Sequence, residues 1–209
     1  MNKQIRSQIL ALLEQTYGNS KSALEYTTPF ELLIAVVLSA QCTDVRVNII
    51  TGRMFPKFGS AEKILALGQI GLEEQIKDCG LFRSKAKNIL ATCQILCQKY
   101  HGEVPQNYEE LVALPGVGRK TANVMLSVAF GQPALAVDTH VFRVANRLKL
   151  ATGDTPLAVE EGLMKIIPRE KWGHAHHWLI WHGRKICKAR KPLCAECPVA
   201  DLCPSSTIL

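Results

Sequence analysis

Four cysteines near the end of the chain have the spacing of ligands to a metal centre. They follow the pattern Cys187-x6-Cys194-x2-Cys197-x5-Cys203. Two disulfides are the alternative, but nothing else in the sequence indicates an oxidising compartment. Four sulfur ligands suit Zn²⁺ or an iron–sulfur cluster. Zinc layouts usually contain two Cys-x2-Cys pairs and this run contains one, so the spacing favours iron and sulfur.

Residues 115–120, Pro-Gly-Val-Gly-Arg-Lys, have the composition of a phosphate-binding turn between two helices. Gly116 and Gly118 allow a tight turn and leave backbone N–H groups uncovered beside a helix N-terminus. Arg119 and Lys120 add positive charge. An ordinary helix–helix turn, with glycines for close packing, is the alternative interpretation.

Lys120 is a candidate nucleophile and Asp138 its candidate partner. Lys120 falls in the first turn of its helix, where the helix dipole and Arg119 disfavour the ammonium form and so favour a reactive amine. A helix from Lys120 to Gly131 rises roughly 17 Å, and after the turn at Gln132-Pro133 the next five or six extended residues return roughly the same distance. The pair suits attack at C1′ of a nucleotide, which yields a Schiff base. A solvated lysine and a simple helix cap are the alternatives.

Helix-start and helix-end signals recur along the chain without strand-like alternation, which predicts an all-α fold. Thr28, Pro29 and Glu31 supply an N-cap, a first-turn proline and a capping-box carboxylate for a buried helix through Leu38. Asp44 is a candidate cap of the next helix. Further helices are expected over about 44–54, from Ser60, over 72–79, from Ser84 to before His101, and over 108–114, 119–130, 138–148, 155–167 and 171–187.

Composition bounds the class of protein. The chain has 209 residues, of which 47% are hydrophobic, enough for one large or two small domains. The net charge of +7 favours a polyanionic partner such as nucleic acid. The apolar run 30–38 is too short for a membrane span of about 20 residues, and residues 1–17 lack the apolar core of a signal peptide. A cytoplasmic protein is therefore expected.

The motifs together resemble the endonuclease III family of the helix-hairpin-helix DNA glycosylase superfamily over essentially the whole length. The matching segments, in the family's order, are residues 38–41 (Leu-Ser-Ala-Gln), 114–122, 137–140 (Val-Asp-Thr-His) and the cysteine run. The resemblance implies a bifunctional base-excision-repair enzyme. As a DNA glycosylase it removes oxidised pyrimidines from duplex DNA, and as an AP lyase it cleaves the strand 3′ to the abasic site by β-elimination.

The resemblance also implies roles for single residues. Lys120 would be the Schiff-base nucleophile and Asp138 the essential carboxylate. Because the target base must leave the stack, Gln41 would enter the vacated space and Leu81 would wedge the opposite strand. His140 would lie near the flipped nucleotide. From the residues alone, Gln41 is only a polar helix end, and Leu81 fits a core position better than a DNA contact. His140 fits a helix surface equally well.

The family's architecture implies two helical domains with a DNA-binding cleft between them. Residues 22–132 would form the domain that contains the helix-hairpin-helix motif. Residues 1–21 and 133–209 would form the other, whose cysteine loop holds a 4Fe-4S cluster. The expected partner is damaged double-stranded DNA. The expected protein is a bacterial monomer without a membrane anchor or an obligate protein partner, located in the cytoplasm and at the nucleoid when bound to DNA.

Basic residues surround the first cluster cysteine. A loop pinned at both ends would present them as a rigid cationic patch for phosphates, with affinity that falls steeply as salt rises. The alternative is an ordinary solvated basic run. The candidate DNA contacts in this region are Arg184, Lys188, Arg190 and Lys191, and those at the turn are Gly116, Gly118 and Arg119.

Two other classes share parts of this pattern. A mismatch-repair adenine glycosylase has the same hairpin, aspartate and cysteine spacing but lacks a lysine at the position of Lys120. A non-catalytic iron–sulfur DNA-binding protein gives no reason for the placement of Lys120 and Asp138. One departure from the family affects the expected lesion range rather than the reaction: Val112 stands where the most familiar member has a glutamate.

Overall fold

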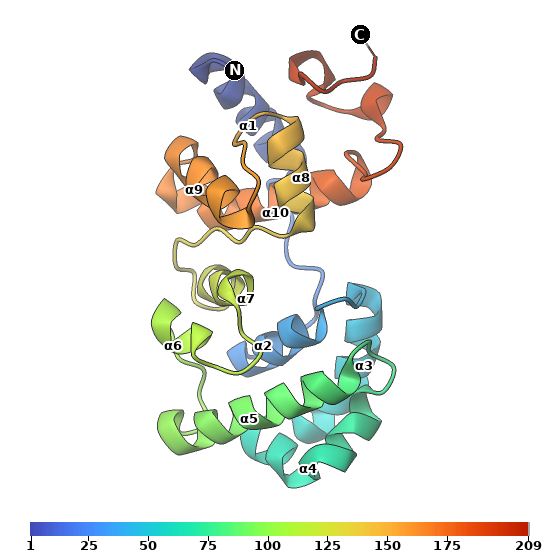
Figure 1. Cartoon of the computed structure of the whole chain (residues 1–209), viewed down its shortest axis with the longest axis vertical. Coiled ribbons are helices and arrows are strands. Elements are labelled where there is room, and N and C mark those ends of the chain that lie inside the picture. Colours follow the sequence, from blue (N-terminus) through green and yellow to red (C-terminus); the bar gives the residue numbers. More distant parts are fainter. Residues whose placement is uncertain (209) are drawn as a thin grey trace. The chain divides into compact units, whose positions relative to one another are not determined.

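The computed structural model describes residues 1–208 and contains helices but no strand within that range (Figure 1). The prediction of an all-α fold is confirmed. The chain divides into two compact units, residues 22–131 and residues 1–21 with 132–209. Among the described residues, no helix combines the length and the apolar character that crossing a membrane requires.

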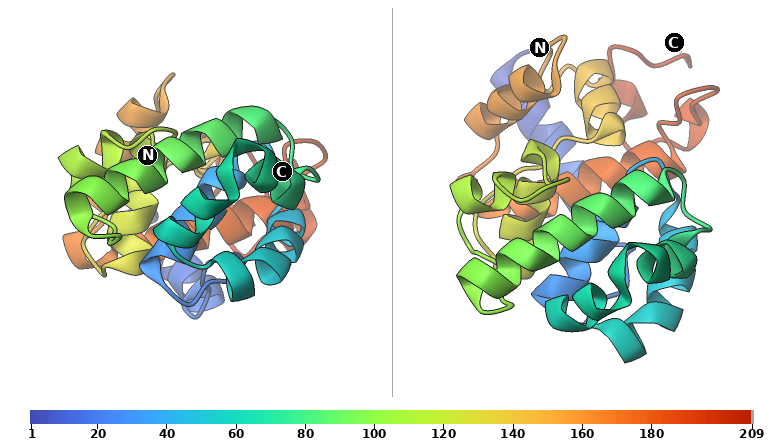
Figure 2. Two further views of the ribbon diagram at one scale, coloured as in Figure 1. Left: turned by 90° about the horizontal axis from the view of Figure 1, so that it is seen from below. Right: turned by 60° about the horizontal axis from the view of Figure 1, so that its bottom comes forward.

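The unit 22–131 surrounds a short, almost fully buried helix, α2. Figure 2 shows α5 running beside α4, the pair with the most extensive helix contact in this unit. Its elements are α2 (Pro29–Leu38), α3 (Asp44–Phe58), α4 (Ala61–Ile76), α5 (Phe82–Tyr100), α6 (Tyr108–Val112), α7 (Arg119–Val124) and the π-helical turn η1 (Met125–Ala129).

The start of α2 follows the sequence signal with one difference. Thr28 is the N-cap, and its hydroxyl oxygen accepts a hydrogen bond from Glu31 N at 3.1 Å. The Glu31 carboxylate accepts from the backbone N–H and the hydroxyl of Thr27, each at 2.6 Å, rather than from Thr28 N. The capping interaction therefore begins one residue earlier than a standard capping box.

Several expected helix boundaries were wrong, among them the end of α3, which lies at Phe58 rather than at Met54. Thr43, rather than Asp44, caps α3, because the Thr43 hydroxyl oxygen accepts from Arg46 N. The helix expected to start at Ser84 begins at Phe82. A separate helix was expected over 72–79, and Gly68, with a non-helical φ of 63° and ψ of −177°, does divide α4 into two helical parts, but the second part begins directly after Gly68 and ends at Ile76.

The second unit packs α10 against α1 and α8. Apolar side chains from all three helices meet in one core that includes Leu13, Val144 and Leu179. Its elements are α1 (Lys3–Tyr17), α8 (Thr139–Arg147), α9 (Pro156–Ile166), α10 (Trp172–Lys185) and the 3-10 turns η2 (Arg169–Lys171), η3 (Cys194–Glu196) and η4 (Ala200–Leu202). The buried His176 ring bonds the Ala136 carbonyl through Nδ1 at 2.8 Å, which ties α10 to the extended stretch before α8.

Candidate functional site

The turn between α6 and α7 is anchored on α5. Val117 N donates to Leu114 O at 3.0 Å, and the Thr92 hydroxyl donates to Pro115 O at 2.8 Å. Gly116 has a φ of +79°, and a Cβ there would lie 3.1 Å from Asn88 Cβ. Both the left-handed backbone and the close approach to α5 therefore require glycine at this position.

Gly118 is different, because the fold does not require it to be glycine. Its φ is −95°, and a Cβ would meet no atom within 4 Å. Gly118 is exposed and is the N-cap of α7, whose first backbone N–H groups follow it. The missing side chain thus leaves the positive end of a helix open to a phosphate.

The two basic residues after this glycine begin α7. The exposed Arg119 donates to the Tyr108 hydroxyl at 3.2 Å, and its guanidinium lies 5.5 Å from the centre of that ring. Lys120 is the second residue of the helix and is half-buried. The turn therefore combines helix N–H groups with a cationic side chain held by an aromatic ring.

The two glycines make a testable contrast. We expect Gly118→Ala to leave the melting temperature nearly unchanged while it weakens binding to duplex DNA, because its methyl group would obstruct a phosphate and no protein atom. Gly116→Ala should instead destabilise the fold by about 1–3 kcal/mol, because alanine is strained at positive φ and crowds Asn88. Thermal unfolding and fluorescence-anisotropy titration would measure the two effects. Unchanged DNA affinity for Gly118→Ala at several salt concentrations would contradict the phosphate assignment.

Asp138 begins α8 directly after the buried extended residues 134–137. It is the N-cap, and its Oδ1 accepts a hydrogen bond from Val141 N at 2.8 Å. The candidate nucleophile and the candidate carboxylate thus each stand at the start of a helix, one in each compact unit.

His140 is held in the same first turn of α8. Burial lowers its pKa below the usual 6.5, and Asp138 opposes that shift. The Arg143 guanidinium contacts His140 Nδ1 at 3.2 Å. At neutral pH the His140 ring is therefore uncharged, which suits contact with a neutral base or sugar rather than with a phosphate.

Gln41 and Leu81 stand in neighbouring loops of the unit 22–131. Gln41 follows α2 and Leu81 precedes α5, and both have left-handed backbones, with φ of 53° and 59°. A Cβ at Gly80 would lie 3.4 Å from Gln41 O, so the loops touch. Both side chains are exposed, and the 59% exposure of Leu81 shows that the core interpretation of this residue was wrong.

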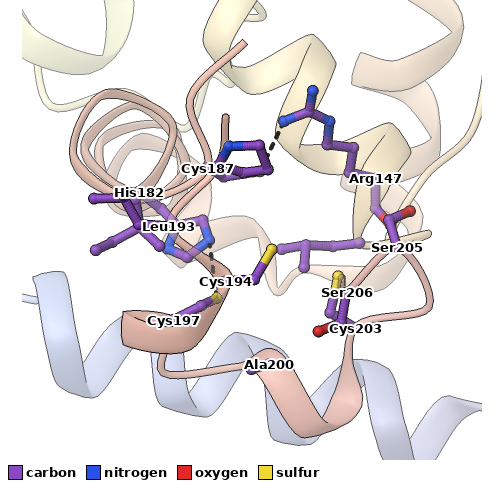
Figure 3. Close-up of a pocket in the computed structure, with 13 residues that line it drawn as sticks. Arg147, His182, Cys187, Leu193, Cys194, Cys197, Ala200, Cys203, Ser205 and Ser206 are labelled. Atoms are coloured by element: carbon purple, nitrogen blue, oxygen red, sulfur yellow. Dashed lines mark hydrogen bonds between the residues drawn. The ribbon is translucent and has the colours of Figure 1, made fainter. Parts of the chain in front are cut away.

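The four C-terminal cysteines surround one cavity of about 40 Å³ (Figure 3). Among residues 1–208, no three or more His, Cys, Asp or Glu side chains converge closely enough to hold a single ion. The cysteines do not meet at one point but are spread around the cavity. Its lining consists of Cys187, Cys194, Cys197 and Cys203 with apolar residues that include Leu148, Ile186 and Leu193. Four thiols around one shared space are a donor set that fits an iron–sulfur cluster.

A buried histidine borders this cavity. His182 Nε2 lies 3.8 Å from Cys197 Sγ, and its Nδ1 lies 3.3 Å from the Tyr17 hydroxyl. Burial lowers the pKa of His182 to about 4, so the ring is neutral at physiological pH. The ring thus links a cysteine of the cavity to α1 without adding charge.

Two arginines of α8 hold the cysteine loop, and the sequence did not reveal them. Arg147 donates to the carbonyls of Lys188 at 2.7 Å and Ala189 at 2.9 Å (Figure 3 shows its contact with Cys187). Arg143 Nε donates to Cys187 O at 3.0 Å. Their i, i+4 spacing placed them on one helix face, but no local signal named a loop about 40 residues away as their partner.

The loop presents its basic residues outward. Lys188, Arg190 and Lys191 are exposed, and Lys191 has a φ of +49°. Arg184, half-buried in the last turn of α10, stacks its guanidinium 5.7 Å from the centre of the Trp181 ring. These four residues therefore belong to the same unit, and the loop backbone that carries three of them is fixed by Arg147.

Family models and curated sequences match the chain over nearly its full length. The model of the HhH-GPD superfamily base excision DNA repair protein matches residues 34–169, and the iron-sulfur binding domain of endonuclease III matches residues 187–203. The chain is 54% identical to endonuclease III of Rickettsia conorii over 97% of each chain. It is 51% identical to endonuclease III of Escherichia coli over 97% of this chain and 96% of that one.

Solved structures agree with these sequence matches. A trapped endonuclease III–DNA covalent intermediate superposes with a TM-score of 0.94 and 49% identity, covering 98% of this chain and 97% of that one. A non-covalent endonuclease III–DNA complex gives the same TM-score at 48% identity, covering 98% and 96%. A thermostable thymine-DNA glycosylase gives 0.86 at 25% identity, covering 97% and 96%.

Proposed function

Because the chain belongs to the endonuclease III family of base excision DNA repair proteins, we propose that Lys120 and Asp138 carry out its DNA glycosylase and AP lyase reactions. The family membership establishes both reactions and the 4Fe-4S cofactor. The assignment of individual residues is our proposal. The observation that carries it is that the family's lysine and aspartate positions each begin a helix, one beside a turn suited to DNA phosphates.

In the glycosylase step, the neutral Lys120 amine attacks C1′ of an oxidised pyrimidine nucleotide. The bond between C1′ and the base breaks, and the base leaves with the bonding electrons and takes up a proton. The Asp138 carboxylate stabilises the positive charge that develops on the sugar. A proton then passes from the former lysine nitrogen to O4′, the bond between C1′ and O4′ breaks, and a protonated Schiff base forms between Lys120 and C1′.

The lyase step uses the same Schiff base. A proton leaves C2′ and the iminium group takes up the electron pair, which gives an enamine. The enamine returns the pair to form a double bond between C2′ and C3′, and the bond from C3′ to its oxygen breaks as the phosphate leaves with the bonding electrons. Water then hydrolyses the imine and restores the Lys120 amine. The DNA strand is cleaved on the 3′ side of the abasic site, and no cofactor atom takes part in this sequence of bonds.

DNA recognition is divided among three groups of residues. The N–H groups that follow Gly116 and Gly118, together with Arg119, hold the phosphate backbone. Gln41 and Leu81 occupy the space left by the extruded base, and His140 contacts the flipped nucleotide. The remaining phosphate contacts come from Arg184, Lys188, Arg190 and Lys191. The affinity should therefore fall steeply as salt rises.

The 4Fe-4S cluster would be held by four cysteines: Cys187, Cys194, Cys197 and Cys203. When bound, the cluster supplies a one-electron centre and four strong bonds that close the loop. The residues Arg143, Arg147 and His182 fix the loop from the protein side. We assign the loop a structural role, in which its backbone orients Lys188 and Arg190 toward phosphates.

The two compact units support a functional division into residues 22–132 and residues 1–21 with 133–209. The first would carry Lys120, the turn and the two loops at Gln41 and Leu81, and the second would carry Asp138 and the cysteine loop.

Val112 at the end of α6 is the position at which lesion preference would differ from that of relatives. We also propose a monomeric state and a cytoplasmic location, at the nucleoid when bound to DNA, as suits a DNA repair protein of a family with bacterial members.

Borohydride trapping tests the proposal. The purified holoprotein is mixed with a duplex that carries one thymine glycol, with an abasic-site duplex and an undamaged duplex in parallel. A covalent adduct on the first two duplexes and none on the third is expected. Trapping on the abasic site alone would leave a lyase with another base specificity, and trapping on neither would overturn the Schiff-base assignment.

A further inference from the structure

Lys85 is a buried lysine that joins two loops of the unit 22–131. It lies in the first turn of α5 and is only 5% exposed. Its Nζ donates to Leu38 O at 2.8 Å and to Ala40 O at 2.6 Å, and it contacts Cys79 Sγ at 3.0 Å. All three partners belong to the chain segments that lead into Gln41 and Leu81.

The position of this ammonium group is costly unless its partners compensate. Lysine is almost never fully buried without paired groups, and the first turn of a helix carries partial positive charge. The carbonyl partners supply partial negative charge, because Leu38 is the last residue of α2 and its carbonyl stands at the negative end of that helix. Lys85 thus acts as a C-cap for α2 that another helix provides.

The same contacts hold the two loops to each other. Cys79 Sγ lies 3.3 Å from Leu38 O, so the segment before Leu81 also reaches the end of α2. The backbones of Gln41 and Leu81 are left-handed, a conformation that residues other than glycine keep only when the surroundings fix it. Lys85 is a buried side chain that contacts the chain before both residues.

We propose that Lys85 is a positioning residue for DNA opening, which fixes the Gln41 and Leu81 loops as one rigid pair. Two side chains that must enter a duplex together lose less entropy on binding when their loops are already ordered. The inference rests on the proposed function, since it assumes that Gln41 and Leu81 enter the space beside an extruded base. Lys85 does not touch the reacting atoms in this scheme.

Lys85→Met is the central variant, because methionine fills similar space without charge or donors. We expect excision of thymine glycol from a duplex to slow by about 10-fold or more. Cleavage of a single-stranded oligonucleotide with a preformed abasic site should change much less, because that substrate has no opposite strand to wedge. If Lys85→Met only destabilised the fold, the duplex reaction and the single-stranded reaction would slow by the same factor.

A fluorescence measurement reports the opening step directly. With 2-aminopurine placed opposite the lesion, the wild-type protein should raise the fluorescence as the base loses its stacking partner, and Lys85→Met should raise it less. In a double-mutant cycle, Lys85→Met combined with Leu81→Ala should slow duplex excision less than the product of the two single effects. Residues that act through one another are not additive.

The chain offers a matched control on the same helix. Lys87 is exposed, so Lys87→Met removes an equal charge from α5 and should leave duplex excision within about twofold. Lys85→Arg keeps the charge and the donors and should recover part of the lost duplex activity. If Lys85→Met does not fold, Lys85→Gln and Cys79→Ala remove fewer of the contacts and should give smaller losses confined to duplex substrates.

The experiments distinguish a failure of the proposed function from a failure of the positioning role of Lys85. If the wild-type protein forms no adduct with either damaged duplex, the proposed function itself is wrong. If the wild type excises the lesion normally and Lys85→Met behaves as Lys87→Met, the positioning role is overturned. The role is also overturned if Lys85→Met slows the single-stranded and duplex reactions by the same factor, or if its effect multiplies with that of Leu81→Ala.

Discussion

Lys120→Ala is expected to abolish borohydride trapping on a thymine glycol duplex and to slow strand cleavage by about 10³-fold or more. The reason is chemical, because alanine has no amine to form the Schiff base. The fold should persist, since alanine is the best helix former and the position is in the first turn of α7. The measurement is single-turnover kinetics with gel analysis of the covalent adduct.

Lys120→Arg is the matched control for charge. Arginine keeps a positive side chain at the turn but stays protonated and forms no imine. DNA affinity close to that of the wild type, together with loss of the adduct, would separate the nucleophile from the phosphate contact. A normal adduct with either variant would show that another amine is the nucleophile.

Asp138→Asn is expected to slow base excision by about 10²-fold to 10⁴-fold with little change in stability. Asparagine caps a helix as well as aspartate does, so its side-chain oxygen can accept the bond from Val141 N that Oδ1 now accepts. It lacks the negative charge that would stabilise the sugar cation. Single-turnover excision and thermal unfolding, measured on the same preparation, report the two properties.

Asp138→Ala removes the cap as well as the charge. It should lose excision activity to a similar extent and also about 1 kcal/mol of stability, which corresponds to a fall in melting temperature of about 2–4 °C for a chain of this size. If Asp138→Asn excised bases at the wild-type rate while Asp138→Ala only melted earlier, Asp138 would be a helix cap and nothing more.

Local signals predicted the helical elements well where the interaction that starts a helix is short-range. Thr28 and Ser60 cap their helices as expected, because the side chain bonds an N–H three residues away. The prediction was wrong by two residues at α5, where no side-chain cap exists and Leu81 takes a left-handed backbone instead. That start depends on contacts outside the helix, which local patterns do not contain.

In the candidate site, too, features set by neighbouring residues could be predicted and features set by distant residues could not. The cysteine run and the glycine turn could be predicted from residue spacing, because the cysteines of the run and the N–H groups of the turn lie within a few residues of one another. The exposure of Leu81 could not be predicted, since a leucine in a loop can be part of the core or lie on the surface. The arginines that hold the cysteine loop were missed because they act across about 40 residues of sequence.

The sequence by itself determined the all-α fold, the family and the four cysteines of the iron–sulfur loop, because helix caps and ligand spacing are encoded by neighbouring residues. Only the tertiary structure decided which lysine is buried. Lys85 differs from Lys87 by its contacts with carbonyls 45 and 47 residues earlier in the chain. Such a contact forms only after α2 and α5 have packed, because the energy that holds the ammonium group comes from the far end of another helix.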